Sequence, residues 1–75
     1  MWYVYGLQGV NGHLYIGSTN DLKRRLGEHN GQRGELKFYV AVNTAKTARS
    51  LEKYFKTGSG KAIIKKRILT DKALA

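Results

Sequence analysis

The 75-residue sequence contains no cysteine, and this absence removes several classes of function. Disulfide bonds, thiolate nucleophiles and cysteine-based zinc sites are all excluded. His13 and His29 are the only histidines, and neither has a second histidine or a cysteine at the spacing of a zinc site. The chain also lacks the Gly-x-Ser-x-Gly turn of a serine hydrolase. Zinc enzymes and serine hydrolases are therefore not expected.

Long hydrophobic runs are missing as well. No segment approaches the roughly 18 apolar residues of a membrane span, and no helical pattern combines a broad apolar face with a basic one. The chain does not open on a charged leader followed by an apolar stretch, so we expect no secretory signal. The expected location is the cytoplasm, with no membrane partner.

Acidic residues are few: five Asp and Glu face 14 Lys and Arg, which gives a net charge of +9 and a pI near 10.1. A domain with this balance is expected to bind a polyanion, and nucleic acid is the first candidate. A chain of this length forms one domain, residues 1–75, and buries only about 60% of its unfolded surface. The core is therefore small, and the oligomeric state is left open.

Three stretches have strand character, because apolar and aromatic residues alternate along them: Met1–Leu7, residues 13–18 and Leu36–Val42. The glycine-rich turn Gln8–Gly12 joins the first two stretches into a hairpin. Three strands suffice for a small sheet.

The length of the hairpin loop decides how two tyrosines are placed. A two-residue turn at Asn11–Gly12 would leave Tyr5 and Tyr15 on opposite faces of the sheet. A five-residue loop over Gln8–Gly12 would set Tyr5 directly across from Tyr15, on one face. The sequence leaves both turns open.

A helical pattern follows the second strand, after three residues that favour helix N-caps, Ser18, Thr19 and Asn20. Leu22 and Leu26 mark its buried stripe, and the same spacing places Arg25 and His29 on that stripe. Charged side chains are rarely buried without a partner. We therefore expect Arg25 to point into a cleft where it meets an anion, and not to snorkel to the helix edge.

Two more helices are expected after the third strand. Asn43-Thr44 can cap the first of them, and Gly58 would end it. Ser59 would then cap a short last helix, in which Ile64 and Ile68 face inward. The fold class is therefore α/β (α+β): a three-stranded antiparallel sheet flanked by about three helices, in the order β-β-α-β-α-α.

Glu52 interrupts the apolar stripe formed by Ala48 and Phe55 in the first of these two helices. One interpretation is a solvated glutamate paired with Arg49 and Lys56. The other is a metal ligand, because a single carboxylate stands in an otherwise basic segment. On the second interpretation, we expect Glu52→Gln to leave the free energy of unfolding unchanged or raised by on the order of 1 kcal/mol.

These elements carry a recognisable series of residues: Tyr3-Val4-Tyr5, Tyr15-Ile16-Gly17, Arg25, His29 and Glu52. In this order and spacing they resemble the GIY-YIG nuclease family, over nearly the whole chain and in the manner of its small stand-alone bacterial members. The chain departs from many members in the short link after His29, which lacks a proline. It departs from DNA-repair members at Ser18, where they carry a lysine.

The resemblance implies hydrolysis of a nucleic-acid phosphodiester with one divalent ion, Mg²⁺ or Mn²⁺. Glu52 would hold the ion, and Arg25 would clamp a phosphate oxygen. The catalytic base would be Tyr5 or Tyr15, with Arg25 and the basic site expected to bring the phenol's pKa toward neutrality. His29 would relay a proton or position a tyrosine.

The remaining cations would contact backbone phosphates without reading sequence; they are Lys23, Arg24, Arg33, Lys53, Lys56, Lys61, Lys65, Lys66 and Arg67. The expected partner is DNA, with RNA left open. The alternative is a non-catalytic basic nucleic-acid-binding module with the same fold. A small basic interaction protein has only composition in its favour.

Overall fold

The computed structural model of the chain describes residues 1–9, 12–29 and 34–68. Its elements are β1 (Trp2–Gln8), β2 (Leu14–Thr19), α1 (Leu22–His29), β3 (Glu35–Val42), α2 (Ala45–Phe55), α3 (Gly58–Ile63) and a π-helical turn, η1 (Ile64–Ile68). This order confirms the expected β-β-α-β-α-α arrangement. No helix within the described ranges is long and apolar enough to cross a membrane.

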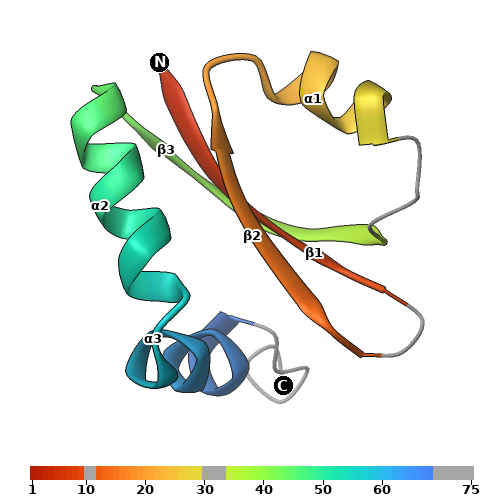
Figure 1. The fold of residues 1–75 in the computed structure, drawn as a ribbon, viewed down its shortest axis with the longest axis vertical. Coiled ribbons are helices and arrows are strands. Elements are labelled where there is room, and N and C mark those ends of the chain that lie inside the picture. The colour runs from red at the N-terminus through yellow and green to blue at the C-terminus, as the bar shows by residue number, and fades with distance from the viewer. Residues whose placement is uncertain (10–11, 30–33, 69–75) are drawn as a thin grey trace.

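The three strands form one antiparallel sheet in the order β2-β1-β3, so β2 lies at an edge. Side chains alternate between the two faces of a strand. Val4 packs with residues of α2 on one face, whereas Tyr3 lies beside Leu22 and Leu26 of α1 on the other. The sheet therefore separates α1 from α2 and α3 (Figure 1).

The β1–β2 hairpin is closed by a loop longer than two residues. The Gly9 amide donates to the His13 carbonyl at 3.1 Å, and Gly12 has a positive φ of 84°. Tyr5 is paired with Gly17, so Tyr15 lies diagonally from Tyr5 on the same face. As expected for a loop longer than two residues, the two tyrosines share one face. The expectation that Tyr5 lies directly across from Tyr15 is wrong, because Tyr15 is paired with Leu7, two residues further along β1.

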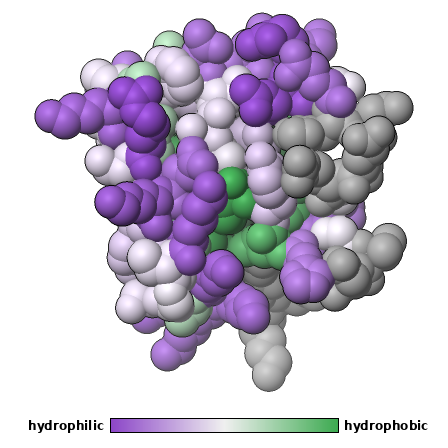
Figure 2. Space-filling model, viewed as in Figure 1, coloured by the Kyte–Doolittle hydropathy of each residue, from purple (hydrophilic) through white to green (hydrophobic). Residues whose placement is uncertain are grey.

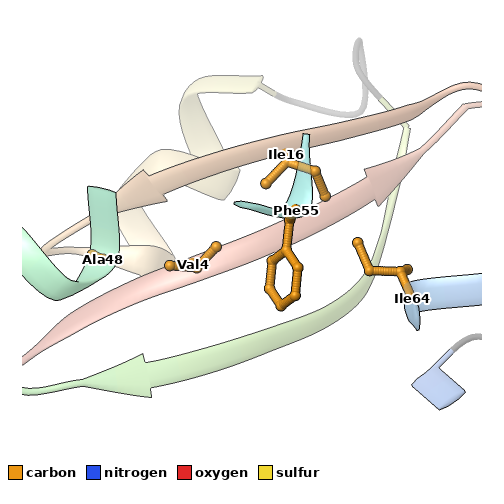
Figure 3. Packing of buried hydrophobic residues seen from close by; sticks show 5 residues of the cluster. All are labelled: Val4, Ile16, Ala48, Phe55 and Ile64. Atoms are coloured by element: carbon orange, nitrogen blue, oxygen red, sulfur yellow. The ribbon is translucent and has the colours of Figure 1, made fainter. Parts of the chain in front are cut away.

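A small apolar core fixes α2 and α3 to the sheet. Val4, Ile16, Ala48, Phe55 and Ile64 are buried together, and the ring of Phe55 lies between Val4 and Ile64 (Figure 3). Full burial of such a side chain contributes roughly 1.5–3 kcal/mol. Since Phe55 is three residues from Glu52 in α2, this packing also fixes the position of Glu52.

The caps of the last helices differ in part from the expectation. Thr44 caps α2 as expected, because its hydroxyl accepts from the Thr47 amide at 3.1 Å. Thr57, and not Ser59, caps α3: its backbone is extended, and its hydroxyl accepts from the Gly60 amide at 3.0 Å. The hydroxyl of Thr57 therefore starts α3 two residues earlier than expected.

Two further expectations for this region are wrong. Gly58 does not end α2 but is the first residue of α3. Ile68 does not face inward and is 38% exposed, whereas Ile64 is fully buried. Ile68 is the last residue of η1, at the end of the described part of the chain, whereas Ile64 packs into the core with Phe55.

Candidate active site

Four of the five predicted catalytic residues come from four different elements: Tyr5 from β1, Tyr15 from β2, Arg25 from α1 and Glu52 from α2. The rings of Tyr5 and Tyr15 lie 6.4 Å apart, inclined at 51°. Arg25 and Glu52 both act on the charge state of Tyr5, and Arg25 acts on that of Glu52. The four side chains therefore meet at the edge strand β2. The fifth, His29, is the last residue of α1, and its side chain lies outside the described part of the chain.

The ring of Tyr5 crosses the edge strand at Gly17. A Cβ atom on residue 17 would lie 2.5 Å from the Tyr5 hydroxyl oxygen and 2.7 Å from its Cζ. Both distances are far shorter than real carbon contacts, so only glycine leaves room for this ring. The glycine of the Tyr15-Ile16-Gly17 triplet thus seats the phenol of Tyr5.

Tyr5 is fully buried, and this burial raises the pKa of its phenol. The neighbouring Tyr15 and Glu52 raise the pKa further, while the charge of Arg25 and its hydrogen bond lower it. The raising effects are the larger, so the expectation that cationic neighbours bring this phenol toward neutrality is wrong for Tyr5. Burial disfavours the phenolate more than one guanidinium favours it.

The raised pKa of Tyr5 has a consequence for alkaline stability. The unfolded chain ionises this phenol near its ordinary pKa of 10.0, before the folded chain does. The stabilising contribution is therefore complete below pH 10 and is lost as the pH rises through the folded-state pKa. We expect the wild type to lose stability above pH 10 more steeply than Tyr5→Phe, as measured by denaturant unfolding at pH 8 to 11. Equal alkaline slopes for the two proteins would contradict this.

Glu52 is held by two hydrogen bonds at its two carboxylate oxygens. Oε1 accepts from the Ser18 hydroxyl at 2.6 Å, and Oε2 accepts from the Lys56 ammonium at 2.8 Å. Burial alone would raise the pKa of this carboxyl, but the hydrogen bonds from Lys56 and Ser18 outweigh burial and lower the pKa. The expected pair with Lys56 is thus present, while the described residues contain no ion pair between Glu52 and Arg49.

The surroundings of Glu52 fit a single hydrated cation. The described residues include no cluster of three acidic or histidine ligands, so water would have to supply most of the coordination, which Mg²⁺ tolerates. The Lys56 ammonium already shows that a cation fits against Oε2. Because the Lys56 side chain is 54% exposed, it can turn to solvent and leave that oxygen to a metal ion.

Arg25 lies on the inner side of α1 with its side chain 35% exposed. Its Nε is buried without a hydrogen-bond acceptor among the described residues and lies 3.5 Å from Oε1 of Glu28, with which it forms an ion pair. The guanidinium also acts on Tyr5 and Glu52, as described above. Arg25 therefore faces the cluster, as its position on the stripe predicts, and the exposed third of its side chain leaves the guanidinium within reach of an anion.

The basic residues expected to contact nucleic acid are exposed on both sides of this edge. Lys23 and Arg24 lie on α1; the others described lie on the opposite side of the sheet, namely Lys53, Lys56, Lys61, Lys65, Lys66 and Arg67. Arg33 lies outside the described residues. Arg24 is already paired with Asp21 and Glu28 on α1. The face drawn in Figure 2 is largely hydrophilic, with a small apolar area near its centre.

The sequence did not predict the roles of two residues near the site, Ser18 and Gly17. Ser18 was expected at a helix N-cap, but Asp21 caps α1, because its Oδ1 accepts from the Arg24 amide at 3.0 Å. Ser18 is 34 residues from Glu52, so no local pattern could reveal their hydrogen bond. Gly17 stood in the family triplet, but its role depends on the register that pairs it with Tyr5.

Comparison with known proteins agrees with this geometry. The model of the GIY-YIG catalytic domain matches residues 1–67. A UPF0213 protein of Bacillus pumilus is 36% identical over 69 residues, which cover 79% of this chain and 70% of that protein. A UPF0213 protein of Streptococcus pyogenes serotype M3 is 36% identical over 64 residues, covering 72% and 70%. No solved structure gives a significant match. The chain therefore belongs to the GIY-YIG family of nucleases.

Proposed function

We propose that this protein is an endonuclease that hydrolyses nucleic-acid phosphodiester bonds with one divalent ion held by Glu52. The observation that carries the proposal is the meeting of Tyr5, Tyr15, Arg25 and Glu52 at one strand edge, from four separate elements. A fold has no structural need for two phenols, a guanidinium and a carboxylate at one small site. DNA is the expected substrate class, because the chain carries a net charge of +9 and the family acts on nucleic acid.

Exposure separates the roles of the two tyrosines. A catalytic base must reach water, and Tyr15 is only partly buried whereas Tyr5 is completely buried with a raised pKa. Tyr15 is therefore the proposed base. Tyr5 is a positioning residue, which holds Arg25 through its hydroxyl.

The remaining groups act on the phosphate. Tyr15, as its phenolate, takes a proton from water, and the water oxygen forms a bond to phosphorus. The ester bond breaks with its electron pair on the leaving oxygen, which then takes a proton from solvent. Arg25 donates to a non-bridging oxygen and stabilises the charge that gathers there. A divalent ion, when bound, supplies Lewis acidity at the phosphate and the leaving oxygen. Ser18 keeps the Glu52 carboxylate oriented, since its hydrogen bond fixes one of the two oxygens.

The test is a cleavage assay with labelled linear, flapped and branched DNA, and matched RNA, in Mg²⁺, Mn²⁺ or chelator. Cleavage of at least one substrate with metal, and none with chelator, is the expected result. Arg25→Ala should lose most of this cleavage, while Arg49→Ala, which removes an exposed arginine of α2 outside the predicted catalytic and phosphate-contacting sets, should retain it. Metal-independent cleavage, or equal cleavage by both variants, would contradict the proposal.

The alternative is a binding module of the same fold without catalysis. It is favoured by the two protein hydrogen bonds that already satisfy both oxygens of Glu52. Such a module would bind the same oligonucleotides and leave all of them intact with either metal. The cleavage assay therefore separates the two functions directly.

Affinity for nucleic acid should depend steeply on salt. Each neutralised phosphate contributes roughly 0.9 to the negative slope of log K against log salt concentration, so about four to six contacts give a slope of about −3.6 to −5.4. Exposed lysines such as Lys61 and Lys65 would make these contacts. Fluorescence anisotropy of a labelled duplex between low and moderate salt measures the slope. A flat affinity would contradict phosphate binding.

A further inference from the structure

A concave surface lies between α1 and the sheet, apart from the cluster of Tyr5, Tyr15, Arg25 and Glu52. It encloses about 450 Å³ and is lined by aromatic, apolar and polar residues. Tyr3 and Tyr39 form its wall on the sheet, and Leu22 and Leu26 form its wall on α1. Lys23 stands at its rim. We call this surface the tyrosine cleft.

The aromatic wall of the tyrosine cleft is unusually open to solvent. Tyr39 is 55% exposed and contacts Tyr3 edge to face, with ring centroids 6.0 Å apart and planes inclined at 69°. In this arrangement, one ring meets the other through an edge, so the exposed area of Tyr39 is not covered by the pair. A planar ligand could stack on it.

The charge at the rim favours an anionic ligand. Lys23 is exposed and forms no ion pair with any of the described residues. The one carboxylate in the lining, Asp21, is already paired with Arg24 at 3.7 Å and also caps α1. The cleft therefore combines a planar apolar surface with an uncompensated cation.

The tyrosine cleft opens on the face of the sheet that carries Tyr5 and Tyr15 of the proposed active site. Tyr3 and Tyr5 are two residues apart on β1, so both point to the α1 face. Tyr39 is paired with Tyr5 in the β1–β3 register, which places it on this face as well. A ligand stacked on Tyr39 would thus lie one strand away from Tyr5.

We propose that the tyrosine cleft binds an unpaired nucleobase, stacked on Tyr39, with the adjoining phosphate held by Lys23. This inference rests on the proposed function and specifies it, because the substrate would carry an unpaired nucleotide beside the bond that is cut. A base inside a duplex is stacked on its neighbours and cannot offer its face to a side chain. Single-stranded or branched nucleic acid meets this requirement.

The test measures binding in chelator, so that no cleavage is needed. The probes are a single-stranded DNA oligonucleotide that contains 2-aminopurine and a duplex of the same sequence. Base stacking on an aromatic side chain is worth enough that Tyr39→Ala should weaken single-strand binding by about tenfold. Duplex binding should not change. The single strand should also show quenched 2-aminopurine fluorescence on wild type but not on Tyr39→Ala.

Two further variants serve as controls. Tyr39→Phe keeps the ring and should bind the single strand as wild type does. Tyr54→Ala removes another partly exposed tyrosine, 40% exposed on α2 at the opposite face, and should change neither affinity. The stacking site would be overturned if Tyr39→Ala lost affinity equally for the single strand and the duplex, or if Tyr54→Ala lost as much single-strand affinity as Tyr39→Ala. Either result would leave the proposed nuclease intact. A wild type that binds neither probe would overturn both.

Discussion

Glu52→Gln is expected to lose metal-dependent cleavage by about a thousandfold or more while the protein still binds nucleic acid. Lewis-acid catalysis is worth several kcal/mol of barrier, and Glu52 is the residue at this site that can hold the ion. Removing one negative charge that faces phosphate should leave binding unchanged or tighter. Single-turnover cleavage and anisotropy on the same oligonucleotide measure the two effects. Glu35→Gln, which removes an exposed carboxylate paired with Lys37, is the matched control and should cleave normally.

Glu52→Gln should also lower the free energy of unfolding. The position of Glu52 on an apolar stripe had suggested the opposite, an unchanged or raised free energy of unfolding. A neutral amide cannot accept the charge-assisted bonds that the Glu52 carboxylate accepts from Ser18 and Lys56. We expect a loss of about 1 kcal/mol, because the Lys56 end of the network is solvent-exposed. A variant that unfolds early yet cleaves normally would make Glu52 a purely structural residue.

The pH dependence of this loss gives an independent check. The pKa of Glu52 is lowered in the folded protein, so its contribution is complete above the ordinary value of 4.5 and is lost as the pH falls through the folded-state pKa. The difference in free energy of unfolding between wild type and Glu52→Gln should therefore shrink from pH 6 toward pH 3. A difference that stays constant over this range would exclude the carboxylate charge as its cause.

Gly17→Ala is expected to cost about 1–3 kcal/mol of stability and to reduce cleavage, because the new methyl group collides with Tyr5. The added Cβ would lie 2.7 Å from Cζ of a ring that is fully buried and cannot easily move away. Denaturant unfolding measures the stability change.

Gly27→Ala is the matched control for this substitution. A Cβ on residue 27 meets nothing within 4 Å, and the residue lies inside α1. Alanine should therefore raise stability by about 1 kcal/mol through helix propensity. If Gly17→Ala were as stable as Gly27→Ala, the seat of Tyr5 on Gly17 would be wrong.

The fold could be predicted from local patterns, and its exceptions arise where local patterns compete. Alternation and periodicity place the strands and helices, so their order is confirmed. The hairpin register could not be predicted, because the two glycines in residues 8–12, Gly9 and Gly12, permit turns of different length. Thr57 and Ser59 both have side chains that can cap a helix, so the sequence could not decide between them. In the structure Thr57 is the cap, and α3 then packs so closely on α2 that a Cβ at Gly60 would collide with the Tyr54 carbonyl.

The site was predictable in its residues more than in its chemistry. The spacing of Arg25 on its helix predicts a side chain that faces the cluster, and the spacing of Lys56 four residues after Glu52 predicts the ion pair that these two residues form. The raised pKa of Tyr5 depends on complete burial, which a strand pattern does not quantify. The bond from Ser18 joins residues far apart in the chain, so it requires the three-dimensional register of β2 against α2.

Binding of Mn²⁺, followed by the paramagnetic resonance signal of the free ion, tests most directly whether Glu52 is the metal site. Wild type should bind one ion, and Glu52→Gln should bind at least tenfold more weakly. Lys56→Gln keeps the carboxylate and removes the ammonium that rests on it, so this variant should bind the ion at least as tightly as wild type. Equal affinity in wild type and Glu52→Gln would contradict the assignment of Glu52 as the metal ligand.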